Sequence, residues 1–151
     1  MEDSDKELAG NYGTRWGRPF RDSGGLTTRI PCLAPIWNGD RFVGIALGDL
    51  RYDDLLRVIA MPEVDGYLDN YVLDDDGRVI VDRALLASKE PLDNSMLPLR
   101  PPSRLALRQA IAEHQTSGTF VAGNALVVFT KMIAPPWYFV AEFDSKTYLL
   151  P

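Results

Sequence analysis

Short runs of apolar, β-branched and aromatic residues recur along most of the chain, separated by turn residues, a pattern that predicts β-strands. Residues 26–36 and 42–47 form the first two runs, and Asn38-Gly39 between them favours a tight turn, so we expect a β-hairpin. Leucines and valines at helical spacing follow up to Pro62, with Asp49 or Asp53 as the cap of this helix. Residues 1–25 are rich in glycine and predict a tail and a loop.

A second series of elements follows. Strands are predicted at 67–73 and 79–81 around a turn at Asp74-Asp75-Asp76-Gly77, and a proline-rich crossing covers 83–103. A helix is predicted from Ser103 to Gln115, ended by Gly118, and strands at 119–122, 125–133 and 137–143 complete the chain. In this helix, Leu105, Leu107, Ile111 and Ala112 are expected to face the core, and Arg104, Arg108 and Glu113 to point outward.

This order of elements predicts the fold class. Two strands, a helical crossing and a three-stranded meander make one antiparallel sheet with helices on one face. We therefore expect an α+β protein with a PAS-like sheet flanked by helices and an extra N-terminal β-hairpin.

One segment of the chain occurs twice. Residues 41–49 resemble residues 136–144, 95 positions later: each is an apolar run that stops at an acid, Asp49 or Asp144, with a leucine six positions beyond it. Two interpretations are open: the two segments are copies of one repeated unit, or they are two strand-to-helix junctions that look alike by chance. If both copies close the same kind of unit, residues 1–49 are the end of one unit and residues 50–151 are a complete second unit.

Composition limits the partners. The chain has 151 residues, 46 % of them hydrophobic, which suffices for one domain or one domain with an appendage. Its net charge of −5 argues against nucleic acid, because phosphate binding needs a basic face. No apolar stretch is long enough to span a bilayer, and the first seven residues are acidic, so we expect a soluble segment without membrane contact.

Catalytic and metal-binding patterns are missing. The single histidine, His114, lies near the end of the predicted helix, and no phosphate-binding loop or nucleophile motif is present, so we expect no enzyme activity and no cofactor. The three acids of Asp74-Asp75-Asp76-Gly77 favour a hairpin turn over a calcium loop, whose ligands alternate along the chain. We expect no metal site.

Several motifs, in order, resemble the double Cache family of sensor domains. They are Trp16-Gly17-Arg18-Pro19-Phe20-Arg21-Asp22, Ala34-Pro35-Ile36, Gly39-Asp40-Arg41-Phe42-Val43-Gly44-Ile45, Gly48-Asp49-Leu50, Tyr71-Val72-Leu73-Asp74 and Pro136-Trp137-Tyr138-Phe139-Val140. Together they cover roughly residues 16–150. The resemblance implies the end of a membrane-distal module before residue 50 and a whole PAS-like proximal module after it.

The resemblance also implies a function. Such domains are extracytoplasmic, or periplasmic, parts of membrane receptors that bind a small molecule and pass a conformational change to an output domain. In amino-acid-sensing members, positions that match Phe20, Asp22 and Asp49 help to hold the ligand. The Arg and Trp of that ligand motif come from an upstream helix, and Arg15-Trp16 stands too close to Phe20 to replace them.

A second pocket is predicted in the complete module, between its sheet and the proline-rich crossing. Its candidate residues are Tyr71, Arg83, Arg100 and Tyr138, with Arg83 as the partner of a ligand carboxylate. The expected ligand is an amino acid, an amine or a carboxylate. The main alternative is a PAS-like interaction module that dimerises and binds no small molecule; a homodimer is a possible assembly in either case, and an enzyme is the remaining alternative.

Overall fold

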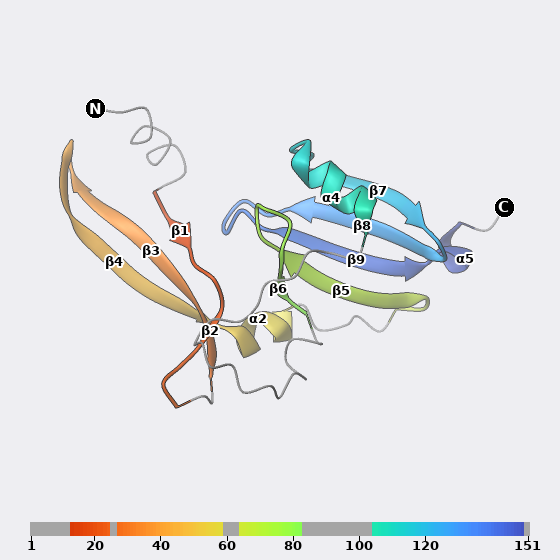
Figure 1. Cartoon of the computed structure of the whole chain (residues 1–151), viewed down its shortest axis with the longest axis horizontal. Helices are drawn as coiled ribbons and strands as arrows, with labels where there is room; N and C mark the ends of the chain where they lie inside the picture. The colour runs from red at the N-terminus through yellow and green to blue at the C-terminus, as the bar shows by residue number, and fades with distance from the viewer. Residues whose placement is uncertain (1–12, 25–26, 59–63, 83–103, 150–151) are drawn as a thin grey trace. The chain divides into compact units, whose positions relative to one another are not determined.

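The structure, a computed structural model, describes residues 13–24, 27–58, 64–82 and 104–149 (Figure 1). The described residues fall into two compact units that divide after Leu55, within helix α2 (Tyr52–Val58). The module boundary predicted between residues 49 and 50 lies inside strand β4 (Arg41–Arg51), two residues before that helix begins. No helix in the described ranges has the length and apolar character needed to cross a membrane.

The first unit is built on a long antiparallel hairpin. Strand β3 (Thr28–Asn38) pairs with β4 along one edge, and with the short strands β1 (Arg15–Trp16) and β2 (Phe20–Arg21) along the other. The predicted hairpin is confirmed, but its turn lies one residue later than expected. Asn38 pairs with Arg41 as part of the ladder, so the two-residue loop is Gly39-Asp40, with Gly39 at φ 60°.

The second unit contains a five-stranded antiparallel sheet. Its strands are β5 (Tyr67–Leu73), β6 (Val79–Val81), β7 (Ser117–Ala122), β8 (Ala125–Lys131) and β9 (Tyr138–Asp144), in the spatial order β6-β5-β9-β8-β7. The last strand thus lies in the centre, between the first strand and the meander, which is the order of a PAS-like sheet. The short helix α5 (Ser145–Tyr148) follows β9, and the Asp144 side chain accepts a hydrogen bond from the Lys146 backbone N–H.

Helix α4 (Leu105–Ala112) covers one face of this sheet (Figure 1). Three residues at helical spacing, Leu107, Ala110 and Ile111, are buried against the sheet. The prediction was wrong for Leu105 and Ala112, which are exposed because they flank this stripe and do not belong to it. The core face of the sheet consists of Tyr71, Leu73, Val79, Ala125, Val127, Phe129, Tyr138 and Val140.

The end of α4 also differs from expectation. Two hydrogen bonds close the helix, from the Gln115 N–H to the Ala110 carbonyl and from the His114 N–H to the Ile111 carbonyl, each 2.9 Å. This is a Schellman ending, in which His114 takes the left-handed position at φ 58° that glycine usually occupies. Gly118, predicted to end the helix, instead lies within β7, where it makes room for the Phe129 ring.

Candidate functional site

Strand alternation places three polar side chains of the second unit on the core face of its sheet. Tyr71 pairs with Val140 and Leu73 with Tyr138, so Tyr71, Tyr138 and Glu142 point to the same side as the core. Two of these three residues, Tyr71 and Tyr138, were predicted as ligand contacts. Glu142 was not predicted, although it stands in an otherwise apolar inward-facing series on β9.

Tyr71, Glu142 and Arg104 form one connected network. The Tyr71 hydroxyl donates to Glu142 Oε1 over 3.0 Å. Arg104 reaches the same carboxylate with Nε (3.3 Å to Oε1) and Nη2 (3.0 Å to Oε2). Tyr71 and Glu142 are each only 8 % exposed, whereas the Arg104 side chain is 30 % exposed. The network therefore runs from the core of the sheet to the surface at the start of α4.

Burial and charge determine the protonation of this network. Burial raises the pKa of Tyr71 above its ordinary value, and the neighbouring Glu142 carboxylate raises it further. The hydrogen bond to Glu142 raises the pKa of Arg104, against the opposing effect of burial. At neutral pH Tyr71 is thus a neutral donor and Arg104 a cation.

Arg104 corrects another prediction. It precedes the first residue of α4 in an extended conformation (φ −91°, ψ 110°), so its side chain does not follow the outward stripe expected from helical spacing. Its side chain lies over the sheet and binds Glu142. The direction of the Arg104 side chain is set by Glu142, 38 positions later in the chain, and the local pattern of residues does not contain this information.

Tyr138 belongs to a separate contact. Its ring is 1 % exposed and lies 5.2 Å from Lys131 Nζ, which pairs with Asp75 Oδ1 at 3.0 Å. Burial alone would lower the pKa of Lys131, but the hydrogen bond and charge of Asp75 outweigh it, and the pKa is raised. Tyr71 and Tyr138 thus share a face of the sheet but have different polar partners.

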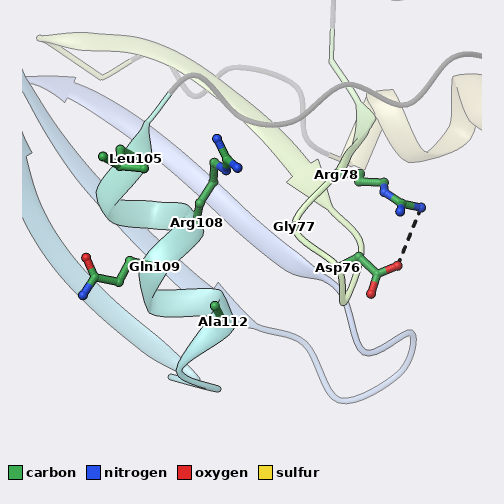
Figure 2. A pocket seen from close by; sticks show the side chains of 7 residues that line it. All are labelled: Asp76, Gly77, Arg78, Leu105, Arg108, Gln109 and Ala112. Atoms are coloured by element: carbon green, nitrogen blue, oxygen red, sulfur yellow. Dashed lines mark ion pairs between the residues drawn. The ribbon is translucent and has the colours of Figure 1, made fainter.

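A groove of about 540 Å³ runs between α4 and the β5–β6 turn (Figure 2). Leu105, Arg108, Gln109 and Ala112 form the helix wall, and Asp76, Gly77 and Arg78 form the turn wall. Two guanidinium groups and one carboxylate therefore line it, with Asp76 and Arg78 paired at 3.7 Å. Leu105, the first residue of α4, lines the groove and directly follows Arg104, so the network and the groove are neighbours at the start of this helix.

The acidic run in this turn has structural contacts. Asp74 Oδ1 accepts from the Arg78 N–H at 2.8 Å, and Gly77 takes φ 75°. Asp75 pairs with Lys131 and Asp76 with Arg78, so the three carboxylates face different partners. Burial raises the pKa of Asp74. These contacts agree with a hairpin turn, as the sequence indicated.

Of the candidates in the first unit, Phe20 lies on β2, Asp49 lies on β4, and Asp22 lies in the loop after β2. Arg29 on β3 pairs across the sheet with Phe20, and its Nη1 binds both carboxylate oxygens of Asp49, at 3.1 and 2.9 Å. Asp22 closes a loop by accepting from the Thr27 N–H at 3.4 Å. Phe20 and Asp49 are thus brought together around Arg29, while Asp22 has a turn role. Arg83 and Arg100 lie outside the described residues.

No protein-family model and no curated protein sequence matches the chain. Solved structures do match its fold. They include the extracellular domain of the candidate histidine kinase mmHK1S-Z2 (13 % identity, TM-score 0.63, 99 % of this chain and 59 % of that one). Another is the ligand-binding domain of the Pseudomonas aeruginosa amino acid chemoreceptor PctB, in complex with L-Arg (16 % identity, TM-score 0.53, 97 % of this chain and 61 % of that one).

A third match is the ligand-binding domain of the Pseudomonas fluorescens chemoreceptor CtaA in complex with L-alanine, at 18 % identity and a TM-score of 0.51; it covers 91 % of this chain and 57 % of that one. The chain thus spans about three fifths of the length of these domains. At such identities the likeness concerns the fold, which is that of extracellular sensor domains with PAS-like antiparallel sheets.

Proposed function

We propose that this chain is part of a double Cache sensor domain of a membrane receptor, that it binds a small molecule outside the cytoplasm, and that it has no enzyme activity. Ligand binding would shift the equilibrium between two conformations and so reach an output domain. Matches with ligand-binding domains of amino acid chemoreceptors support this proposal. The single observation that carries it is the buried Tyr71–Glu142–Arg104 network on the sheet face under α4.

The network favours a zwitterion over a singly charged ligand. A ligand that enters between Arg104 and Glu142 separates a cation from a largely buried carboxylate, and each charge left alone is costly. The carboxylate of an amino acid can replace Glu142 at Arg104, and its ammonium group can replace Arg104 at Glu142. An amine or a carboxylate alone satisfies only one of the two. We therefore propose an amino acid as the ligand.

A thermal-shift titration tests this assignment, because a ligand that binds only the folded state raises the melting temperature. Suitable probes are L-alanine, L-arginine and L-glutamine, with ethylamine and propionate as singly charged analogues. We expect a rise with at least one amino acid and none with the analogues. Arg104→Gln should abolish the rise, and Arg108→Gln, on the exposed side of the same helix, should preserve it.

Other outcomes would change the proposal. Loss of the response only in Arg108→Gln would move the site to the groove in Figure 2. A flat response to every probe would argue against a sensor. The exposed apolar face of the β3–β4 hairpin, with Leu47 78 % exposed, would then favour the second candidate, an interaction module without a small-molecule ligand.

A further inference from the structure

The Arg104–Glu142 contact and the groove beside α4 meet at the start of this helix. Arg108, on the helix wall of the groove, lies one turn beyond Arg104, and its backbone N–H donates to the Arg104 carbonyl over 3.3 Å. One helical turn corresponds to about 5.4 Å along the axis. A ligand held at Arg104 therefore has the groove beside it and a second arginine one turn further along the helix.

The Arg108 side chain points back toward the start of α4. Figure 2 shows it extending along the helix toward the level of Leu105, into the space between the helix and the turn that carries Arg78. This is the usual direction of long side chains in α-helices. Arg108 is exposed, and its guanidinium group makes no hydrogen bond or ion pair with any described residue. Its charge is therefore available to a ligand in the groove.

The charges that line the network and the groove do not balance. Glu142 opposes the charge of Arg104. Asp76 opposes that of Arg78, at 3.7 Å. Among the described charges of this region, that of Arg108 is left in excess. A neutral amino acid would keep this excess and a basic one would add to it, whereas an acidic side chain would cancel it.

The spacing of the two arginines selects the length of such a ligand. The two carboxyl carbons of glutamate in an extended conformation are about 5 Å apart, close to the pitch of an α-helix. Aspartate is shorter by one methylene group, and glutamine has the length without the second charge. Glutamate can thus place one carboxylate at Arg104 and the other at Arg108.

We propose that the ligand is an amino acid with an acidic side chain of the length of glutamate, and that Arg108 is the residue that selects it. The α-carboxylate binds Arg104 and the ammonium group binds Glu142, while the side-chain carboxylate lies in the groove against Arg108. This inference rests on the function proposed above, because it requires an amino acid at the network.

Calorimetric and thermal-shift titrations of the whole chain test the selection. The probes are L-glutamate, L-glutamine, L-aspartate and L-alanine at constant ionic strength, with glutarate as a dicarboxylate without an ammonium group. We expect glutamate to have a Kd about fivefold lower than glutamine, the upper value for one exposed ion pair. Aspartate should bind more weakly than glutamate, and glutarate should give no shift.

The two proposals fail in different ways. A response to alanine and glutamine without a preference for glutamate would overturn the role of Arg108 and leave the amino acid site in place. Absence of a response to every amino acid would overturn both. Binding of glutarate as tightly as glutamate would also overturn this inference, because the ligand would then not need Glu142.

Variants of Arg108 identify the residue that selects. Arg108→Gln should give glutamate and glutamine the same Kd and leave the Kd of alanine unchanged, and Arg108→Lys, which keeps the charge, should retain a preference for glutamate. Arg41→Gln is the matched control, because it removes an equal charge at an exposed position of the first unit. A preference that survives in Arg108→Gln, or that is lost equally in Arg41→Gln, would overturn the assignment.

Discussion

Replacement of Arg104 by Gln tests whether the buried network stabilises the second unit. The change removes the cation that binds both oxygens of Glu142 and leaves this carboxylate, on a residue 8 % exposed, with Tyr71 as its described side-chain donor. Breaking a fully buried ion pair costs about 3–5 kcal/mol, and an exposed pair contributes about 0–1 kcal/mol. Because the Arg104 side chain is 30 % exposed, water can replace part of the contact, and we expect a loss of about 2 kcal/mol.

Urea unfolding followed by circular dichroism measures this loss. A change of about 2 kcal/mol corresponds to a roughly 30-fold change in the unfolding equilibrium constant, well above experimental error. Arg108→Gln is the matched control, because Arg108 is an exposed arginine on the same helix, and its loss should change the free energy of unfolding by less than about 0.5 kcal/mol.

A double-mutant cycle with Glu142→Gln separates the pair from general damage to the helix. The two substitutions should be non-additive by about 1–2 kcal/mol, since both remove the same contact. Equal stability of Arg104→Gln and Arg108→Gln, or simple additivity in the cycle, would refute the reasoning that the Arg104–Glu142 contact stabilises the fold.

Three further predictions concern single positions. Tyr71→Phe should lower the free energy of unfolding by about 1–2 kcal/mol at pH 8, as measured by urea unfolding of both proteins. Because the folded-state pKa of Tyr71 is raised, the stability difference between the two proteins should be fully present below about pH 10 and should shrink as the pH rises further. Gly118→Ala should cost about 1–3 kcal/mol by the same assay, because a Cβ there would lie 2.7 Å from the buried Phe129 ring, whereas Gly48→Ala, with open space, should be nearly neutral. His114→Gly should raise the free energy of unfolding by about 1 kcal/mol, since His114 holds φ 58°, and Gln115→Gly, one position later, should give no such gain.

Local patterns predicted the strands well because each one is encoded in a few adjacent residues. Strand 67–73, strand 79–81 and the β3–β4 hairpin follow from runs of apolar, aromatic and β-branched residues and from turn residues such as Gly39 and Gly77. The prediction that Gly118 ends helix α4 was wrong because the local signal was misleading. Glycine is the usual signal for a left-handed residue, and here His114 occupies that position while Gly118 serves the packing of Phe129.

The candidate site was predicted only in part. Tyr71 was identified from its place on a strand, but its partners Glu142 and Arg104 lie 71 and 33 positions further along the chain, and their meeting depends on sheet order and on the angle at which α4 begins. One signal was available: Glu142 is a charged residue at an inward position of β9, and a buried charge requires a cation.

The repeated segment shows how a similar sequence can have two electrostatic roles. Asp144 follows the last inward residue of β9 and caps α5 through the Lys146 N–H, whereas the matching Asp49 lies before the end of β4 and binds Arg29. The difference arises because β4 continues two residues further, to Arg51, before its helix begins. The Arg29–Asp49 pair is also exposed, with both side chains about one third accessible, so it contributes little stability. A ligand ammonium group could therefore compete with Arg29 for Asp49 at small cost, whereas at Glu142 it must replace a largely buried contact. If both sites bind amines, the first should have low selectivity, and only the second should require a zwitterion.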